Sequence, residues 1–275
     1  MELLEIRKEI VSNLKGDFPD FIDKLNYFII QKLSSKKNSV VKIIFNRPTK
    51  HFPKNIVIKI FRTNNAQKEY SELIKLKNQE LTVPEVLFYK NPFLILNYVE
   101  GENLCDYINN KLVDIQELNS LDRDTRSKIE EALFKLAGWL GNLHINNLFS
   151  KEDISVLNKG DTRLRDFIFN TENGIIYGTD FEEVYAGNHI DDLAWVCCSL
   201  LDTNPGIFEM NEPKPKIDLI NLFLKYYYEL NSGFEFNFNY FAEQLIEDLN
   251  EVMRRRNLQM SLNKTSFIKD ISREI

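Results

Sequence analysis

The sequence predicts an α+β fold with strands in the N-terminal part and a mainly helical C-terminal part. Residues 27–99 contain short apolar segments rich in β-branched residues, which are typical of strands. The last of these segments, residues 93–99, leads to Gly101, and beyond this glycine apolar residues recur at the spacing of helices. We therefore expect two domains, residues 1–100 and residues 101–275.

The composition is that of a globular protein. The 275 residues include 43% hydrophobic and 28% charged residues, which is sufficient for a substantial core. The net charge of −6 argues against a surface that attracts nucleic acid as a whole, so any such contact would need a local basic patch. The longest apolar run, around residues 193–201, is far shorter than the roughly 18 to 20 residues that span a bilayer. We expect no membrane association.

The cysteines and the N-terminus indicate a cytoplasmic location. Cys105, Cys197 and Cys198 lack the spacing of a zinc site or of a disulfide framework. Such cysteine usage is typical of a reducing compartment. The first ten residues mix charged and apolar side chains and lack the apolar core of a signal peptide.

The first domain is expected to begin with a helix and to continue into an antiparallel hairpin. Residues 1–26 carry apolar side chains at loose helical spacing. Residues 27–33 and 40–45 are two apolar segments around the polar run of residues 34–39, and this pattern predicts a hairpin. A third strand is expected over residues 55–61, where the side chains alternate between two faces.

Lys59 is a charged residue on this otherwise apolar third strand. The alternation directs Ile56, Ile58 and Ile60 to one face and Lys59 to the other. A buried lysine is costly unless it is paired or meets an anion. Two interpretations stay open: Lys59 reaches solvent from an edge strand, or it pairs with Glu69 in the following helix. The second arrangement would hold the ammonium where it can bind nucleotide phosphates.

The second domain is expected to contain long amphipathic helices. Residues 126–145 form one such helix, and His144 near its end is interpreted as a packed or capping residue and not as a ligand. Residues 217–231 and 240–262 show the same pattern. The charge run of residues 254–256 is interpreted as a solvated face.

A polar, charged loop in residues 158–170 runs directly into an apolar segment. Asp161 and Asp166 lie five residues apart in it with Arg163 between them, and Asp180 follows on the next apolar segment. In phosphoryl transfer, one aspartate orients and deprotonates the attacking hydroxyl, and further oxygen ligands hold magnesium ions. Taken alone, the residues also fit a hairpin with surface charges.

Taken in order, these segments resemble the aminoglycoside phosphotransferase and choline kinase family, small-molecule relatives of the protein kinases. The resemblance covers roughly residues 27–201 and lies in the ordered set of motifs. VIKIF and KEYSEL are similar to the strand and the helix that supply a phosphate-binding lysine and its glutamate partner, here Lys59 and Glu69. FLILNYVEGENL is similar to the hinge, where backbone groups at Asn97 and Val99 would bind adenine.

The second half of the resemblance concerns the catalytic loop. WLGNLH is similar to the helix before that loop, and KGDTRLRDFIF is similar to the loop pattern H-G-D-x-x-x-x-N. The resemblance implies that Asp161 is the catalytic aspartate and that Asp166 and Asp180 are the metal ligands. It also implies that Arg163 stabilises the transferring phosphoryl group. In the segment TDFEEVYAGNHIDDLA, Asp192 corresponds to the aspartate that braces the catalytic loop.

Two departures affect the loop chemistry. Lys159 replaces the usual histidine, and Asp166 replaces the usual asparagine. The extra carboxylate beside Asp161 and Asp180 would cause repulsion without a metal ion, and bound Mg²⁺ would relieve it. We therefore favour an active, strongly metal-dependent enzyme over a degenerate one.

The resemblance implies a protein-kinase-like bilobal fold with a small N-terminal antiparallel sheet lobe that binds nucleotide and a larger, mainly helical C-terminal lobe. It implies an ATP-dependent phosphotransferase that uses ATP and Mg²⁺ to phosphorylate a hydroxyl of a small-molecule acceptor. Glu182, Glu183 and Asp191 could favour a cationic amine or sugar, although acidic residues near a metal site are common. The alternatives are a kinase of a protein or an RNA, against which the helices of residues 217–262 argue, and a non-catalytic nucleotide-binding module.

Overall fold

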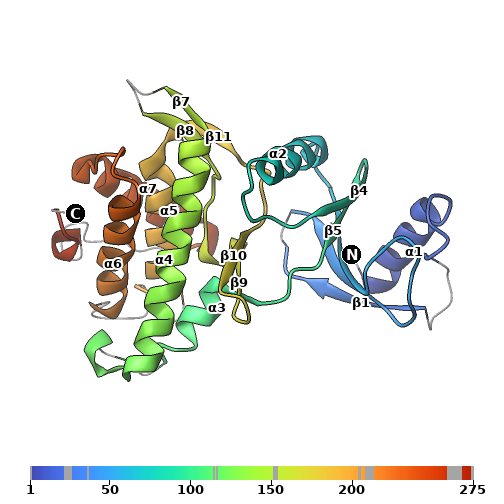
Figure 1. The fold of residues 1–275 in the computed structure, drawn as a ribbon, viewed down its shortest axis with the longest axis horizontal. Coiled ribbons are helices and arrows are strands. Elements are labelled where there is room, and N and C mark those ends of the chain that lie inside the picture. The colour runs from blue at the N-terminus through green and yellow to red at the C-terminus, as the bar shows by residue number, and fades with distance from the viewer. Residues whose placement is uncertain are drawn as a thin grey trace. The chain divides into compact units, whose positions relative to one another are not determined.

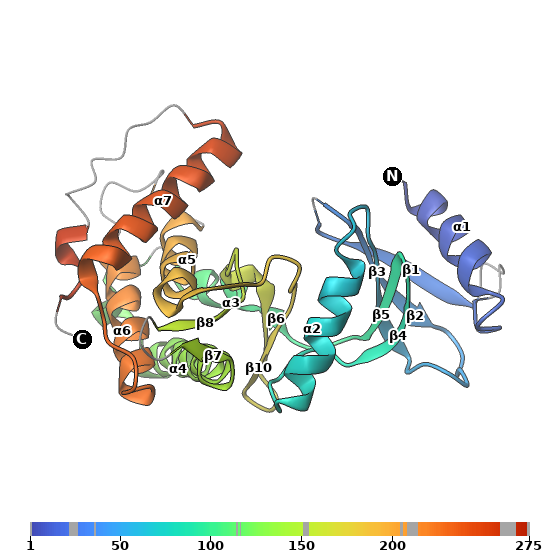
Figure 2. The same ribbon diagram turned by 90° about the horizontal axis from the view of Figure 1, so that it is seen from above.

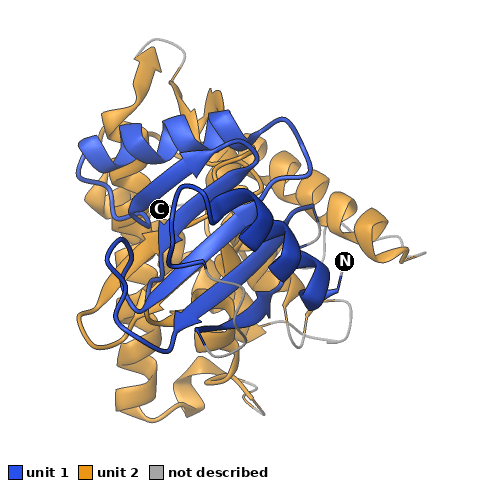
Figure 3. Cartoon of the chain, turned by 90° about the vertical axis from the view of Figure 1, so that its right-hand side faces the viewer, with its two compact units in different colours: residues 1–99 blue, residues 100–275 orange. Residues whose placement is uncertain are grey.

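The protein is described by a computed structural model. The described residues are 2–21, 27–35, 37–113, 115, 117–150, 154–203, 206–207, 214–258 and 268–273. The chain divides into two compact units, Met1–Val99 and Glu100–Ile275, coloured blue and orange in Figure 3. An antiparallel sheet dominates the first unit and helices dominate the second, so the predicted α+β class is confirmed.

The N-terminal unit is built on a five-stranded antiparallel sheet with the order β1-β2-β3-β5-β4. Its strands are β1 (Phe28–Leu33), β2 (Ser39–Phe45), β3 (Asn55–Ile60), β4 (Val86–Lys90) and β5 (Phe93–Asn97). The predicted hairpin and third strand are therefore confirmed. Since β3 has a partner strand on each side, Lys59 is not on an edge strand.

Two helices, α1 (Leu3–Leu14) and α2 (Ala66–Asn78), cover opposite faces of this sheet (Figures 1 and 2). Buried apolar residues of α1 join one core cluster with Ile56, Ile58 and Ile60. The helix expected over residues 1–26 is shorter than predicted, because α1 ends at Leu14 and Gly16 follows it within two residues. Residues 22–26 lie outside the described part of the chain.

The C-terminal unit combines helices with two small antiparallel sheets. Its α-helices are α3 (Leu104–Asn109), α4 (Arg123–Asn146), α5 (His189–Asp202), α6 (Lys214–Leu230) and α7 (Phe238–Arg256), with short 3₁₀ turns η1 (Leu118–Ser120), η2 (Leu164–Asp166) and η3 (Ile268–Asp270). One sheet consists of β10 (Ile175–Gly178), β9 (Phe167–Asn170) and β6 (Glu102–Asn103), and the other of β11 (Tyr185–Asn188), β8 (Ser155–Asn158) and β7 (Leu148–Ser150).

The core of this unit lies between paired helices. α4 packs against α6, and α5 packs against α7 (Figure 1). The predicted apolar face of α4 is buried, and so is the predicted stripe of α7, which consists of Phe241, Leu245, Leu249 and Val252. α7 ends at Arg256 because Asn257 adopts a left-handed conformation with φ 55° and caps the helix, whereas the sequence predicted a longer helix. Among the described residues, no helix is both long enough and apolar enough to cross a membrane.

Candidate active site

The candidate site is built on two segments that run side by side in the C-terminal unit. Residues 159–166 connect β8 to β9, and residues 179–184 connect β10 to β11. Because β8 pairs with β11 and β9 pairs with β10, both connections run between the same two sheets. The loop that carries Asp161 and Asp166 therefore lies beside the segment that carries Asp180.

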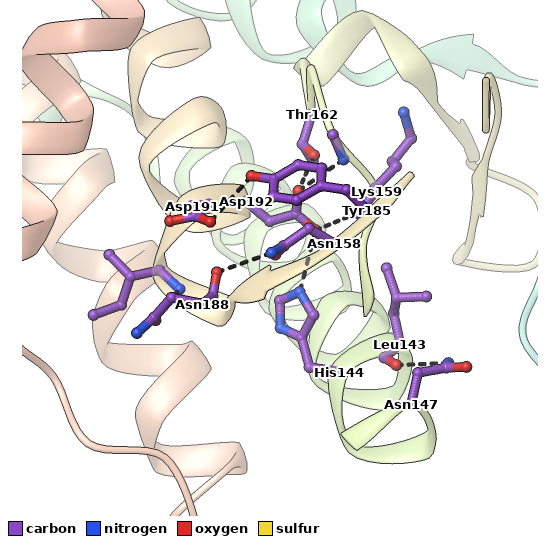
Figure 4. A network of polar contacts seen from close by, with 12 residues as sticks. Leu143, His144, Asn147, Asn158, Lys159, Thr162, Tyr185, Asn188, Asp191 and Asp192 are labelled. Atoms are coloured by element: carbon purple, nitrogen blue, oxygen red, sulfur yellow. Dashed lines mark hydrogen bonds and ion pairs between the residues drawn. The ribbon is translucent and has the colours of Figure 1, made fainter. Parts of the chain in front are cut away.

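Asp192 holds the first of these segments by its backbone (Figure 4). This side chain lies in the first turn of α5 and is completely buried. Its carboxylate accepts the backbone N–H of Lys159 at 2.8 Å and that of Gly160 at 3.1 Å, and it also accepts the hydroxyl of Thr162. Three hydrogen bonds from one short stretch fix the path of the chain into Asp161.

His144 of α4 also contacts the carboxylate of Asp192. Its Nε2 lies 3.2 Å from Oδ2 of Asp192, and its Nδ1 lies 2.8 Å from the hydroxyl of Tyr227. Burial alone would raise the pKa of Asp192, but the contacts with His144, Thr162 and the N–H of Lys159 outweigh it and hold the pKa below its usual value. His144 is a packed histidine, in agreement with the prediction, and Asp192 is an ionised anchor for the loop.

The backbone of the loop adopts left-handed conformations at two consecutive residues. Gly160 has φ 70° and Asp161 has φ 44°. A Cβ atom at position 160 would collide with the backbone carbonyl of Glu183, so glycine is required there for two reasons. Asp161, a residue other than glycine in this region, is held in a conformation that costs about 1–2 kcal/mol in an L-residue and that is often found at functional sites.

Arg163 connects the two carboxylates of the loop. Its Nη2 lies 3.4 Å from Oδ2 of Asp161, and its Nε lies 3.2 Å from Oδ2 of Asp166. The side chain of Arg163 is 26% exposed, so a ligand can reach the guanidinium. The structure thus brings Asp161, Arg163 and Asp166 together as the spacing predicted.

Asp166 has a buried side chain, and its backbone is hydrogen-bonded to the second segment. Its carbonyl oxygen accepts the N–H of Thr179 at 2.8 Å and the hydroxyl of Thr179 at 2.9 Å, directly before Asp180. Burial raises the pKa of Asp166, Lys159 and Arg163 oppose this, and Asp180 and Asp161 add to it. The positive charges of Lys159 and Arg163 therefore do not fully offset the burial of the Asp166 carboxylate. Carboxylate oxygens such as those of Asp166 and Asp180 are hard donors that suit Mg²⁺, and a bound ion would supply further positive charge.

Lys159, which stands in place of the expected histidine, links the two segments. Its ammonium donates a hydrogen bond to the carbonyl oxygen of Asp180 at 3.1 Å, and the residue is 1% exposed. The same ammonium lies 5.7 Å and 5.6 Å from the ring centroids of Phe167 and Phe181. Lys159 therefore donates a hydrogen bond that joins the two segments, a role that the sequence did not predict.

In the N-terminal unit, Lys59 and Glu69 form a buried ion pair. The Nζ of Lys59 lies 2.6 Å from Oε2 of Glu69, and their side chains are 8% and 2% exposed. Of the two interpretations of Lys59, the pair with the helix is confirmed. Lys59 and Glu69 come from β3 and α2, so the sheet and the helix that covers it fix the ammonium from both sides.

The fold is shared with solved structures of small-molecule kinases. The streptomycin–ATP–APH(2″)-IIa ternary complex matches with a TM-score of 0.54 at 16% identity, over 96% of this chain and 97% of that chain. An amicoumacin kinase in complex with AMP-PNP, Ca²⁺ and Ami matches with a TM-score of 0.51 at 12% identity, over 98% and 94% of the two chains. Choline kinase from Cryptosporidium parvum Iowa II matches with a TM-score of 0.50 at 12% identity, over 91% and 95%. This protein has the fold of these kinases.

The likeness is one of structure. No protein-family model matches the sequence, and no curated protein is significantly similar to it. At identities of 10–16%, the shared fold constrains the architecture and leaves the chemistry to the individual residues.

Asn97 and Val99 lie where the first unit of this kinase fold ends. Asn97 is the last residue of β5, and its N–H donates to the carbonyl of Glu85 at 2.9 Å. That N–H is already hydrogen-bonded, so an adenine contact at Asn97 would have to be made by its carbonyl oxygen. Val99 is buried and is the last residue of the N-terminal unit.

The charge run of residues 254–256 is exposed, as predicted, but Arg255 and Arg256 also make contacts beyond their own helix that the sequence did not predict. Nη1 of Arg255 lies 3.0 Å and 3.2 Å from the two carboxylate oxygens of Asp161. Nη2 of Arg256 lies 2.7 Å from Oδ1 of Asp202. Arg255 and Asp161 are 94 residues apart in the chain, and no local pattern signals their contact.

The acidic residues proposed near an acceptor differ in their surroundings. Asp191 accepts the hydroxyl of Tyr240 at 2.8 Å and that of Tyr185 at 3.1 Å. Glu182 is buried, whereas Glu183 is exposed. The two tyrosines were not predicted as partners because they lie on β11 and α7, on either side of α5 in the sequence.

Proposed function

We propose that the protein is an ATP-dependent phosphotransferase that moves the γ-phosphoryl group of Mg-ATP to a hydroxyl of a small-molecule acceptor. The observation that carries the proposal is the loop of residues 159–166. Its backbone is bound to a buried carboxylate, it holds Asp161 in a left-handed conformation, and it places a guanidinium between Asp161 and Asp166. The shared kinase fold supports this interpretation.

Each residue has a separate role in the proposed reaction. Asp161 orients the acceptor hydroxyl and takes its proton, as a carboxylate with oxygen lone pairs available can do. Arg163 stabilises the negative charge that develops on the transferring group. Lys59 binds the α and β phosphates, and Glu69 holds its ammonium in place.

Asp166 and Asp180 are the proposed metal ligands. Their oxygen atoms would hold Mg²⁺, which would supply positive charge against the negative charge of the phosphates. The extra charge of Asp166 relative to an asparagine makes the burial of this site more costly without a cation, as its raised pKa indicates. We therefore expect a strong dependence of folding and turnover on the divalent ion.

The acceptor is proposed to be a small hydroxyl compound. The relatives of known structure include kinases named for amicoumacin and choline, and one is a complex with streptomycin. Within this chain, Glu183 is an exposed carboxylate next to the loop, because the backbone of Glu183 contacts Gly160. A cationic acceptor would gain from this charge.

The proposal is tested by nucleotide binding and turnover together. Thermal unfolding is measured with Mg-ATP, and phosphate release is then measured with and without pooled metabolites. The variant Asp161→Asn keeps the shape of the side chain and tolerates a left-handed backbone. We expect it to lower kcat at least about a hundredfold, the size of a general-base contribution, while the stabilisation by Mg-ATP persists.

The outcomes separate the candidate functions. Unchanged turnover in Asp161→Asn would overturn the assignment of the base. Stabilisation by Mg-ATP without turnover under any acceptor would favour a non-catalytic nucleotide-binding module. Absence of any nucleotide effect on the wild-type protein would contradict both.

A further inference from the structure

We propose that Arg255 is a positioning residue that holds the carboxylate of Asp161 in its reactive orientation. The inference rests on the proposed function, because it gives Asp161 the role of the base. Arg255 lies on α7, far from the loop in the chain, and the sequence indicated it only as part of a solvated charge run.

The contact is made by a single nitrogen shared between both oxygens of the carboxylate. Nη1 of Arg255 lies 3.0 Å from Oδ1 and 3.2 Å from Oδ2 of Asp161. Nη2 of Arg163 approaches Oδ2 at 3.4 Å. An ionised carboxylate has about four lone-pair sites, so these contacts fix its rotation and leave capacity to accept an acceptor hydroxyl.

The guanidinium of Arg255 is itself held by neighbours. Its Nε donates to Oε1 of Glu251, one helical turn earlier, at 2.9 Å. Its Cζ lies 5.4 Å from the ring centroid of Trp195 on α5. An arginine that is oriented in this way loses little additional side-chain entropy when it binds Asp161.

The end of α7 is anchored to α5 beside this contact. Nη2 of Arg256 lies 2.7 Å from Oδ1 of Asp202 and donates to its carbonyl oxygen at 3.1 Å. The helix is capped directly afterwards by Asn257, and its apolar stripe is buried. These contacts hold the C-terminal end of α7 firmly against α5. The contact of Arg255 with Asp161 is therefore better explained as positioning of the carboxylate than as a reversible inhibition of the site.

Asp161 needs such a support because of its backbone. Its φ of 44° is unfavourable for an L-residue, and Asp192 fixes only the backbone before it and the hydroxyl of Thr162 after it. Among the described residues, Asp161 forms ion pairs with Arg163 and Arg255. Without Arg255, only the pair with Arg163 would remain. Since Arg163 also binds Asp166, the carboxylate would turn toward that side.

The test uses the full chain and the hydrolysis of Mg-ATP, with water as the acceptor. We expect Arg255→Ala to lower kcat at least about tenfold, because a hydrogen bond between charged groups is lost, and to change KM for ATP less than about twofold. Arg255→Lys keeps the charge without the forked geometry, so it should recover part of the loss. Because a smaller folded fraction would also lower the apparent kcat and leave KM unchanged, the folded fraction is measured by thermal unfolding and kcat is expressed per folded molecule.

Arg254→Ala is the matched control. Arg254 precedes Arg255 on the same helical turn, its side chain is 76% exposed, and it pairs with Glu251. We expect kcat to stay unchanged in this variant. An equal loss of kcat in Arg254→Ala would point to a general effect on the helix end and would overturn the inference. Should Arg255→Ala fail to fold in thermal unfolding, Arg255→Lys carries the test, with a lower kcat and an unchanged KM expected.

The remaining outcomes distinguish this inference from the proposed function. If Asp161→Asn abolishes turnover while Arg255→Ala retains it, Arg255 has no positioning role and the proposed function stands. If Arg255→Ala increases kcat, the contact is inhibitory and the inference is wrong. If wild-type protein turns over no Mg-ATP with water or with pooled metabolites as the acceptor, or if Asp161→Asn retains turnover, the proposed function fails and the inference fails with it.

Discussion

The ammonium of Lys159 lies 3.1 Å from the carbonyl oxygen of Asp180 and joins the two segments of the candidate site. Burial raises the pKa of Asp166, and the positive charge of Lys159 opposes this rise. The loop pattern that this segment resembles has a histidine at this position, and lysine can likewise supply an N–H donor.

Removal of this ammonium should weaken the response to magnesium. Lys159→Met keeps the length of the side chain but loses the donor, so the Asp180 segment is held less firmly and Asp166 is harder to ionise. We expect a smaller rise of Tm with Mg-ATP than in wild type, measured by thermal unfolding. Lys159→His is the control, because it retains a donor and should keep most of the response. An equal response in Lys159→Met and wild type would contradict this role.

The two proposed metal ligands should differ in how well they tolerate replacement by asparagine. Asp166→Asn keeps an oxygen ligand and removes a charge whose burial is costly, so turnover should stay within about tenfold of wild type and metal-free stability should rise. Asp180→Asn should abolish the stabilisation by Mg-ATP. Thermal unfolding with Mg²⁺, Mn²⁺ or EDTA provides the measurement. Loss of the metal response in Asp166→Asn alone would reverse the assignment.

The buried pair of Lys59 and Glu69 allows folding and nucleotide binding to be separated. Lys59→Met removes the cation beside a buried carboxylate and should cost about 3–5 kcal/mol of unfolding free energy, measured in urea. Combining it with Glu69→Leu should restore much of that stability, because an apolar pair then fills the space. Neither variant should gain Tm with Mg-ATP. A nucleotide response in the stable double variant would exclude Lys59 as a phosphate ligand.

Asp248 should make the protein less stable as the pH rises. Burial, followed by the charge of Asp191, raises the pKa of Asp248 to about 8, and its Oδ2 lacks a hydrogen-bond partner among the described residues. The unfolded carboxyl has a pKa of about 3.9, so the folded chain binds the proton more tightly between these two values. This contribution to stability is therefore present at low pH and is lost as the pH rises toward 8, by up to about 1.4 kcal/mol per pH unit.

The matching variant is Asp248→Asn, which keeps the shape and cannot ionise. Its unfolding free energy should exceed that of wild type at pH 8, and the difference should shrink toward pH 5. Urea unfolding at several pH values measures both curves. Parallel curves for the two proteins would contradict the shifted pKa of Asp248.

Local patterns in the sequence were sufficient for most of the architecture. Alternation over residues 55–61 predicted β3, and helical spacing predicted α4, because each pattern reports which side of one element is buried. The charged loop is also evident in the sequence, since Asp161 and Asp166 lie within a few residues of each other. Errors occurred at helix ends such as Leu14 and Arg256, where a few residues decide the capping.

The sequence by itself determined the α+β class, the order of the segments and the carboxylates of the loop, because these depend on neighbours along the chain. Only the tertiary structure decided what surrounds those carboxylates. Packing of α7 on α5 brings Arg255 to Asp161, and the pairing of β8 with β11 brings Lys159 to Asp180. Such contacts join residues that are distant in the chain, and they form only when buried apolar faces have fixed where each element lies.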